Sequence, residues 1–210
     1  MTKLLPQNLL QAEEQILTSL LNCLSDNATT RISINVKLEG LRIQPVAIRL
    51  AKNLQERNIQ PVLIWPDAGA TALAKRDAPE FQEYIYSFSD ILKNEINELD
   101  GYVVIAVSPQ PYDYEIFEAL CNKLSNKVLM FNGKLDDSAV GIGSVARERR
   151  KNFSSKWNNI YWLEPLQKGA LLKLYKENWK LFRLDIDGYR FQAEYESKPS
   201  KELIFETFLN

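Results

Sequence analysis

The chain contains no histidine, and this absence removes several common catalytic arrangements. It excludes serine or cysteine paired with histidine, zinc sites that use imidazole, and the commonest general base near neutral pH. Any catalysis would rest on carboxylates, lysine, arginine, tyrosine, a bound metal or helix ends. We recognise no catalytic constellation of this kind, so we assign no catalytic residue, metal or cofactor. The sequence leaves enzyme activity open and favours a protein that is not an enzyme.

Cysteine is scarce, and long apolar runs are absent. The two cysteines, Cys23 and Cys121, fall within helical patterns, which is typical of small core residues and not of a disulfide framework. No apolar run reaches the length of a membrane-spanning helix. The N-terminal segment has neither the apolar region of a secretory signal nor the arginine content of a transit peptide. These features predict that the protein is located in a reducing compartment inside the cell.

An excess of charge of one sign is also missing, since the formal net charge is -1. Nucleic-acid-binding domains usually carry a basic excess or stripe, so we expect no DNA partner. The chain has 210 residues, of which 45% are hydrophobic, and is long enough for one domain with a sizeable core. We interpret residues 1–210 as a single domain, made of an α/β part (1–156) and an antiparallel part with a closing helix (157–210). The oligomeric state stays open.

Strand and helix patterns alternate through the first part of the chain. Continuous apolar runs at 62–65, 102–107 and 128–131 are typical of parallel strands that are covered on both faces. Segment 31–38 instead alternates apolar and polar residues, which predicts a strand with one wet face at or near a sheet edge. Helical patterns occupy residues 6–24, 45–57, 68–76, 114–124 and 138–150. This alternation predicts a Rossmann-like open, mainly parallel sheet with helices on both faces.

The rhythm changes after Trp157. Four strand patterns follow one another too closely for crossover helices, at 160–163, 169–175, 179–185 and 189–195. They predict an antiparallel meander that extends the sheet or packs beside it, followed by a closing helix over 200–209. Four aromatic residues gather around this meander, namely Trp157, Tyr161, Trp162 and Trp179. We expect most of them to be packing residues, while exposed members would suit a protein interface.

In an open parallel sheet, ligands bind beyond the carboxyl ends of the strands. The segments after Trp65, Val107, Phe131 and Leu163 should therefore share one rim. The candidate ligand-binding residues of this rim are Asp67, Gly69, Ser108, Asn132 and Asp136.

The turn "PDAGA" after Trp65 has the small residues that let a phosphate approach a helix N-terminus. Asp67, however, occupies the expected N-cap position, where its carboxylate would satisfy the free N–H groups itself. We interpret the turn as a capped strand-to-helix connection. If a ligand binds at this turn, we expect a hydroxyl group or a cation in preference to a bare phosphate.

Four basic residues stand close together in "ARERRK": Arg147, Arg149, Arg150 and Lys151. A solvated helix end explains them, because cations favour the negative pole of a helix. The alternative is a patch for phosphate or for an acidic partner, since arginine suits bidentate recognition. A further alternative, RNA binding, is to be abandoned if Arg147 and Arg149 are held in internal salt bridges.

Three stretches resemble a domain family of unknown function from cyanobacteria and plastids: "WPDAGATALAKRD", "LMFNGKLDDSAVGIGSVARERRKNF" and "YWLEPLQKGALLKLYKENWKLFR". The family includes the plant low photosystem II accumulation protein, which assists assembly of that complex. The resemblance runs from about Leu4 to the closing helix, and its most specific parts are 66–77 and 169–183. Members carry Trp where this chain has Ala78, and no catalytic residues are established for the family.

The resemblance implies a non-enzymatic accessory protein of photosynthesis, acting in photosystem assembly or maintenance. Its partner would be a protein client, such as a photosystem subunit or assembly factor, bound through the basic helix or the aromatic meander. The location implied is cytoplasmic in a cyanobacterium or stromal in a plastid, peripheral to the thylakoid membrane. The alternative is a Rossmann-like protein or enzyme that binds a nucleotide or phosphorylated metabolite at the rim.

Overall fold

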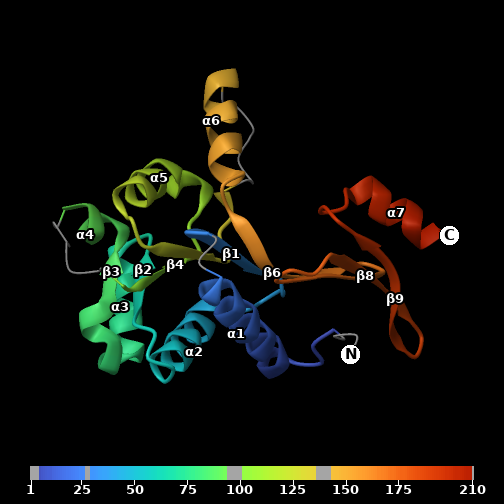
Figure 1. The fold of residues 1–210 in the computed structure, drawn as a ribbon, viewed down its shortest axis with the longest axis horizontal. Helices are drawn as coiled ribbons and strands as arrows, with labels where there is room; N and C mark the ends of the chain where they lie inside the picture. The colour runs from blue at the N-terminus through green and yellow to red at the C-terminus, as the bar shows by residue number, and fades with distance from the viewer. Residues whose placement is uncertain (1–4, 27–28, 94–100, 136–142, 210) are drawn as a thin grey trace. The chain divides into compact units, whose positions relative to one another are not determined.

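The structure is a computed structural model, and it describes residues 5–26, 29–93, 101–135 and 143–209. Its strands form one mixed sheet in the order β3-β2-β4-β5-β1-β6-β7-β8-β9 (Figure 1). The strands from β3 to β6 run parallel, and β6 to β9 form an antiparallel meander. The predicted fold class, a mainly parallel α/β sheet extended by a meander, is confirmed.

The described chain divides into two compact units. The unit that we call the α/β unit comprises residues 29–33, 42–93, 101–135 and 143–158. The unit that we call the meander unit comprises residues 5–26, 34–41 and 159–209. Strand β1 (Arg31–Val36) is divided between them, so each unit is described by itself.

The α/β unit contains the strands that the continuous apolar runs predict. Its strands are β2 (Pro61–Trp65), β3 (Ile85–Ser87), β4 (Val103–Val107) and β5 (Lys127–Phe131). Its helices are α2 (Ile43–Gln55), α3 (Ala68–Asp77), α4 (Phe88–Lys93), α5 (Tyr114–Lys123) and α6 (Ser144–Ser154), with 3₁₀ turns η1 (Pro79–Tyr84) and η2 (Pro111–Asp113). In Figure 1, α2 and α3 cover one face of these strands, and α4 and α5 cover the other. Two-sided cover explains why every residue of β2 and β4 is buried.

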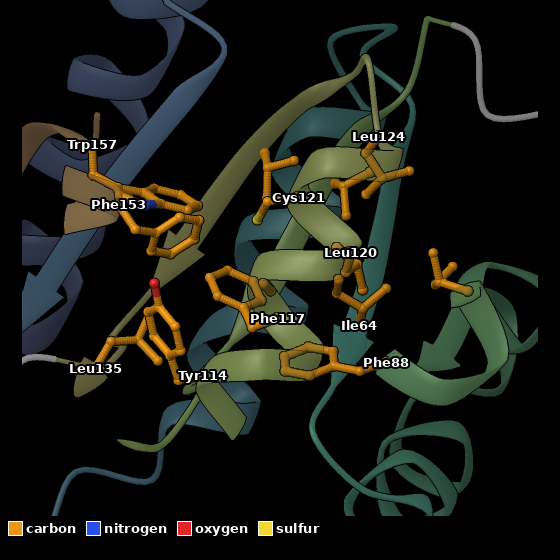
Figure 2. Close-up of a cluster of buried hydrophobic side chains, with 14 of the residues drawn as sticks. Ile64, Phe88, Tyr114, Phe117, Leu120, Cys121, Leu124, Leu135, Phe153 and Trp157 are labelled. Carbon is orange, nitrogen blue, oxygen red and sulfur yellow. The ribbon is translucent and has the colours of Figure 1, made fainter. Parts of the chain in front are cut away.

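The core of the α/β unit forms where α5 packs on the strands. Phe117, Leu120 and Cys121 of α5 are buried together with Val104 of β4 and Val128 of β5. Figure 2 shows the rings of the aromatic residues in this cluster grouped beside α5. Both cysteines of the chain are buried free thiols, which confirms their interpretation as core residues.

The prediction of an edge position for β1 is wrong. In the sheet, β1 lies between β5 and β6. Two of the residues expected on a wet face are buried, with Ser33 exposed by 2% and Asn35 by 6%, while Arg31 is half-buried. Asn35 Nδ2 donates to Asn159 Oδ1 at 3.3 Å, and this hydrogen bond offsets part of the cost of burying the amide. Alternating apolar and polar residues show that the two faces of β1 differ in polarity, but in this sheet both faces are covered.

Two short elements, β3 and α4, have no counterpart in the sequence-based prediction. Helix α6 also ends at Ser154, four residues beyond the predicted end at Arg150. The extension has a physical cause, because Phe153 in the last turn is 5% exposed and packs in the core cluster. Residues 136–142, which include the predicted start of this helix, lie outside the described residues.

The meander unit combines a long N-terminal helix with antiparallel strands. Its elements are α1 (Leu9–Ser25), β6 (Asn158–Leu166), β7 (Gly169–Leu174), β8 (Trp179–Asp185), β9 (Gly188–Tyr195) and α7 (Lys201–Leu209). Tyr161 of β6 is buried, and its hydroxyl donates to Gln15 Oε1 of α1 at 3.2 Å. Trp162 and Trp179 pack edge to face at 5.6 Å between ring centroids. The predicted meander and closing helix are confirmed.

Candidate functional site

The first candidate site is the rim at the carboxyl ends of β2, β4 and β5, which run parallel and therefore end at one edge. Asp67 begins α3 as its N-cap, and its Oδ1 accepts from the Ala70 N–H at 2.8 Å. A side chain at Gly69 would bring a Cβ atom to 3.1 Å from that same oxygen. The turn is therefore the capped start of α3, and Gly69 is small enough to fit beside the capping carboxylate of Asp67.

Ser108 and Asn132 lie at the ends of β4 and β5, and both adopt left-handed backbone conformations, with φ of 54° and 57°. This conformation costs a residue with a side chain about 1 kcal/mol or more. Ser108 N donates to Phe131 O at 2.7 Å, and Gln110 Nε2 donates to Ser108 O at 2.8 Å. The first hydrogen bond joins the two strand ends, and the second occupies the Ser108 carbonyl from within its own segment.

Asp113 is a rim residue that sequence reasoning missed. Its carboxylate accepts from the Gln110 N–H at 2.8 Å in a capping box at η2. Burial raises the pKa of Asp113 above its usual value, and the nearby charge of Asp67 raises it further. The Gln-x-x-Asp spacing of Gln110 and Asp113 was the available signal, since a capping box uses residues three apart. The negative charge of Asp67 thus acts on Asp113, which follows a different strand.

Two parts of the predicted rim are not found at the carboxyl ends of β2, β4 and β5. Asp136 lies outside the described residues. The segment after Leu163 does not form a rim loop, because β6 continues to Leu166 and pairs with β7 over these residues. Within the described part of the chain, no group of three or more Asp, Glu, Cys or His side chains is placed to hold a metal ion.

The second candidate site is the basic helix α6. Arg149 makes an ion pair with the carboxylate of Glu118, which is 8% exposed, and the Tyr114 hydroxyl donates to the same carboxylate at 2.9 Å. The Arg150 guanidinium lies 4.6 Å from the centroid of the Tyr114 ring. Burial and the hydrogen bond to Glu118 raise the pKa of Tyr114 to about 12. Tyr114 therefore stays neutral and serves as a platform for the arginines.

Arg147 and Lys151 differ from their two basic neighbours. Both side chains are exposed, and neither has a partner among the described residues. They stand four residues apart on α6, so they share one face of the helix. The structure thus divides the predicted patch into two arginines that attach to the core and two cations that are open to solvent.

The four aromatic residues that the sequence predicts around the meander contribute little exposed surface. Trp157, Tyr161, Trp162 and Trp179 are all exposed by 8% or less. Their interpretation as packing residues is confirmed. Of the two predicted partner surfaces, α6 has most of its described side chains in solvent, while the meander exposes Tyr189 and Phe191 of β9 by 49% and 50%.

Together these observations define an α/β protein with an open sheet. Hydrogen bonds within the chain occupy polar groups at the rim of this sheet, and the basic helix is exposed. Over residues 6–205 the chain matches the family model described as "Domain of unknown function (DUF1995)", and it belongs to that family. The predicted likeness to a family of unknown function over nearly the whole chain is thereby confirmed. No curated protein matches the chain. Among the described residues, no helix combines the length and apolarity that crossing a membrane requires.

Proposed function

We propose that this protein is a non-enzymatic accessory protein of photosynthesis that binds an acidic protein client through α6 during photosystem assembly or maintenance. The observation that carries the proposal is the exposure of α6. Of the described side chains in this helix, only Phe153 is buried, while Arg147 and Lys151 face solvent without partners among the described residues. The resemblance of the sequence to the photosystem-associated family supplies the cellular setting, peripheral to the thylakoid membrane.

Charge determines the kind of client. The two free cations of α6 attract carboxylates, and charge complementarity of this kind raises association rates and selects partners. Arg149 and Arg150 hold the helix through Glu118 and Tyr114, so the binding face is positioned before the client arrives. A client with an acidic surface matches this arrangement.

Two alternatives have less support. RNA binding loses part of its support because Arg149 makes an ion pair with Glu118, although Arg147 has no partner among the described residues. Binding of a nucleotide or phosphorylated metabolite at the rim would require free donors at the start of α3, at Ser108 and at Asn132. Asp67 caps α3, and the end of β4 is bonded to the end of β5. We therefore assign the client-binding role to α6 and not to the rim.

The test is complementation of a deletion strain with charge-reversed variants. The variant Arg147→Glu with Lys151→Glu reverses the free cations of α6. The matched control, Lys168→Glu with Lys201→Glu, changes the net charge equally at exposed positions of the meander unit. We expect the deletion to lower photosystem accumulation under strong light, and the wild type and the control to restore it. The α6 variant should fail to restore it, although circular dichroism shows it folded.

Two results would contradict the proposal in different ways. Normal photosystem accumulation and growth in the deletion strain would remove the photosynthetic role. Full restoration by the α6 variant would leave the role intact and exclude α6 as the client surface.

A further inference from the structure

A hollow of about 340 Å³ opens at the amino end of β1, away from the predicted rim. Its wall comes from three separated parts of the α/β unit: the segment entering β1, the end of α5, and the end of α6 with the residues after it. The lining residues are Thr29, Thr30, Arg31, Cys121, Asn122, Phe153, Lys156 and Trp157. Its volume falls in the range that small-molecule sites occupy.

The lining carries positive charge and no acidic side chain. Arg31 donates to the backbone carbonyls of Asn126 at 3.0 Å and Leu124 at 2.9 Å, and it has no carboxylate partner among the described residues. Lys156 is exposed and makes no ion pair with any residue that the structure describes. The carboxyl ends of α5 and α6 each contribute roughly half a negative charge. Two cations against these two helix ends leave roughly one net positive charge in the hollow.

Free polar groups stand beside these cations. The Asn122 amide and the Thr30 hydroxyl have no hydrogen-bond partner among the described residues. Together with the Lys156 ammonium they offer donors to an anionic oxygen. The four N–H groups at the end of the Arg31 side chain are committed to carbonyls, so this residue acts through its charge.

The remaining wall is apolar. Phe153 and Trp157 meet edge to face at 5.7 Å between ring centroids, and Cys121 lies in the same cluster. Figure 2 shows Phe153 and Trp157 together, at the end of the cluster near α6. The indole N–H of Trp157 has no partner among the described residues, but it is sealed from solvent, so it is not a direct donor to a ligand. A molecule in the hollow would meet charge and amides on one side and aromatic carbon on another.

We propose that this hollow binds a small organic oxyanion: a phosphate monoester or carboxylate group attached to a compact aromatic or apolar body. The oxyanion lies against Lys156, Asn122 and Thr30 within the field of Arg31. The apolar body packs against Phe153 and Trp157. A bare anion would leave most of the hollow to water, and a neutral apolar molecule would leave the cations unused. This site is independent of client binding by α6.

The test uses isothermal titration calorimetry on the full chain with three aromatic probes. Phenyl phosphate and benzoate carry the two oxyanions, and benzyl alcohol is the neutral analogue. We expect one or both anions to bind and benzyl alcohol to bind more weakly by about tenfold, which corresponds to the loss of one close charge contact. The stronger of the two anions identifies the head group.

Matched charge reversals locate the binding. Lys156→Glu places a negative charge in the hollow and should weaken the anions by about tenfold or more. Lys168→Glu makes the same charge change at an exposed position outside the lining and should leave the affinities of both anions unchanged. Both positions are exposed, so both variants should fold. No binding of either anion, equal binding of benzyl alcohol, or equal binding by the Lys156→Glu variant would each overturn the proposal. Because Lys151 belongs to the α6 client face and Lys156 to the hollow, the two proposals fail separately.

Discussion

At the scale of single residues, reciprocal capping explains how a helix as short as α4 forms. The Ser87 N–H donates to Asp90 Oδ2 at 2.9 Å, and the Asp90 N–H donates to Ser87 Oγ at 3.1 Å. This capping box satisfies donors that a helix start leaves free, and it positions Phe88 and Ile91 for burial. The hydrogen bond from the Ser87 backbone, followed by the one from its side chain, lowers the pKa of Asp90.

Asp90→Ala should lower the free energy of unfolding by about 1 kcal/mol at neutral pH, the usual effect of losing a cap. The folded pKa lies below the value of 3.8 for an unperturbed carboxyl. The contribution is therefore present above that value and is lost as the pH falls through the folded pKa. Urea unfolding at neutral pH and at about pH 3 should show the difference between wild type and variant shrinking in acid.

The control for this prediction is Glu39→Ala, which removes an exposed carboxylate that has no hydrogen bond in the described part of the chain. It should change the free energy of unfolding by less than about 0.5 kcal/mol. A difference for Asp90→Ala that is the same at both pH values would show that the cap does not depend on the ionised carboxylate.

At the scale of secondary-structure elements, α6 depends on one apolar side chain at its carboxyl end. The Phe153 ring lies 5.5 Å from the Tyr114 ring and 5.7 Å from the Trp157 ring, centroid to centroid. The described side chains of the preceding two turns are exposed or half-buried. The helix is therefore attached through Phe153 and through the contacts of Arg149 and Arg150, and its solvent-facing side is available to a client.

Phe153→Ala should cost about 3–5 kcal/mol in the free energy of unfolding, because it removes a buried ring and leaves a cavity. Val145→Ala is the matched control on the same helix, since Val145 is 81% exposed and should cost less than about 0.5 kcal/mol. Chemical denaturation measures both. Similar costs for the two variants would mean that Phe153 does not anchor the helix.

At the scale of the whole molecule, the two compact units share a strand. Residues 31–33 of β1 belong to the α/β unit, and residues 34–36 belong to the meander unit. Unfolding of either unit therefore disrupts a strand that the other one uses. This continuity supports the interpretation of residues 1–210 as a single domain, which stays a prediction.

Thermal unfolding should accordingly be one cooperative transition. For 210 residues the calorimetric enthalpy should be about 150 kcal/mol near 60 °C and should equal the van't Hoff enthalpy. Differential scanning calorimetry provides both values. Two resolved transitions, each with part of the enthalpy, would show that the units unfold independently and that the single-domain interpretation is wrong.

Features that depend on near neighbours in the chain could be predicted from the order of the amino acids. Continuous apolar runs identified β2, β4 and β5, and the Asp67 cap could be predicted, because burial periodicity and capping bonds act over a few residues. The same local reasoning could have found the Ser87–Asp90 capping box, whose spacing is visible in the sequence.

Which strand faces are covered, and which distant groups meet, depends on how the elements pack in the folded protein. This packing placed the alternating strand β1 between two others, because the burial of a polar face depends on neighbouring elements and not on the strand's own pattern. It brought Arg149 to Glu118 and assembled the positive hollow from residues 29–31, 121–122 and 153–157. Electrostatic and cavity effects act through space, and the order of residues along the chain does not contain those distances.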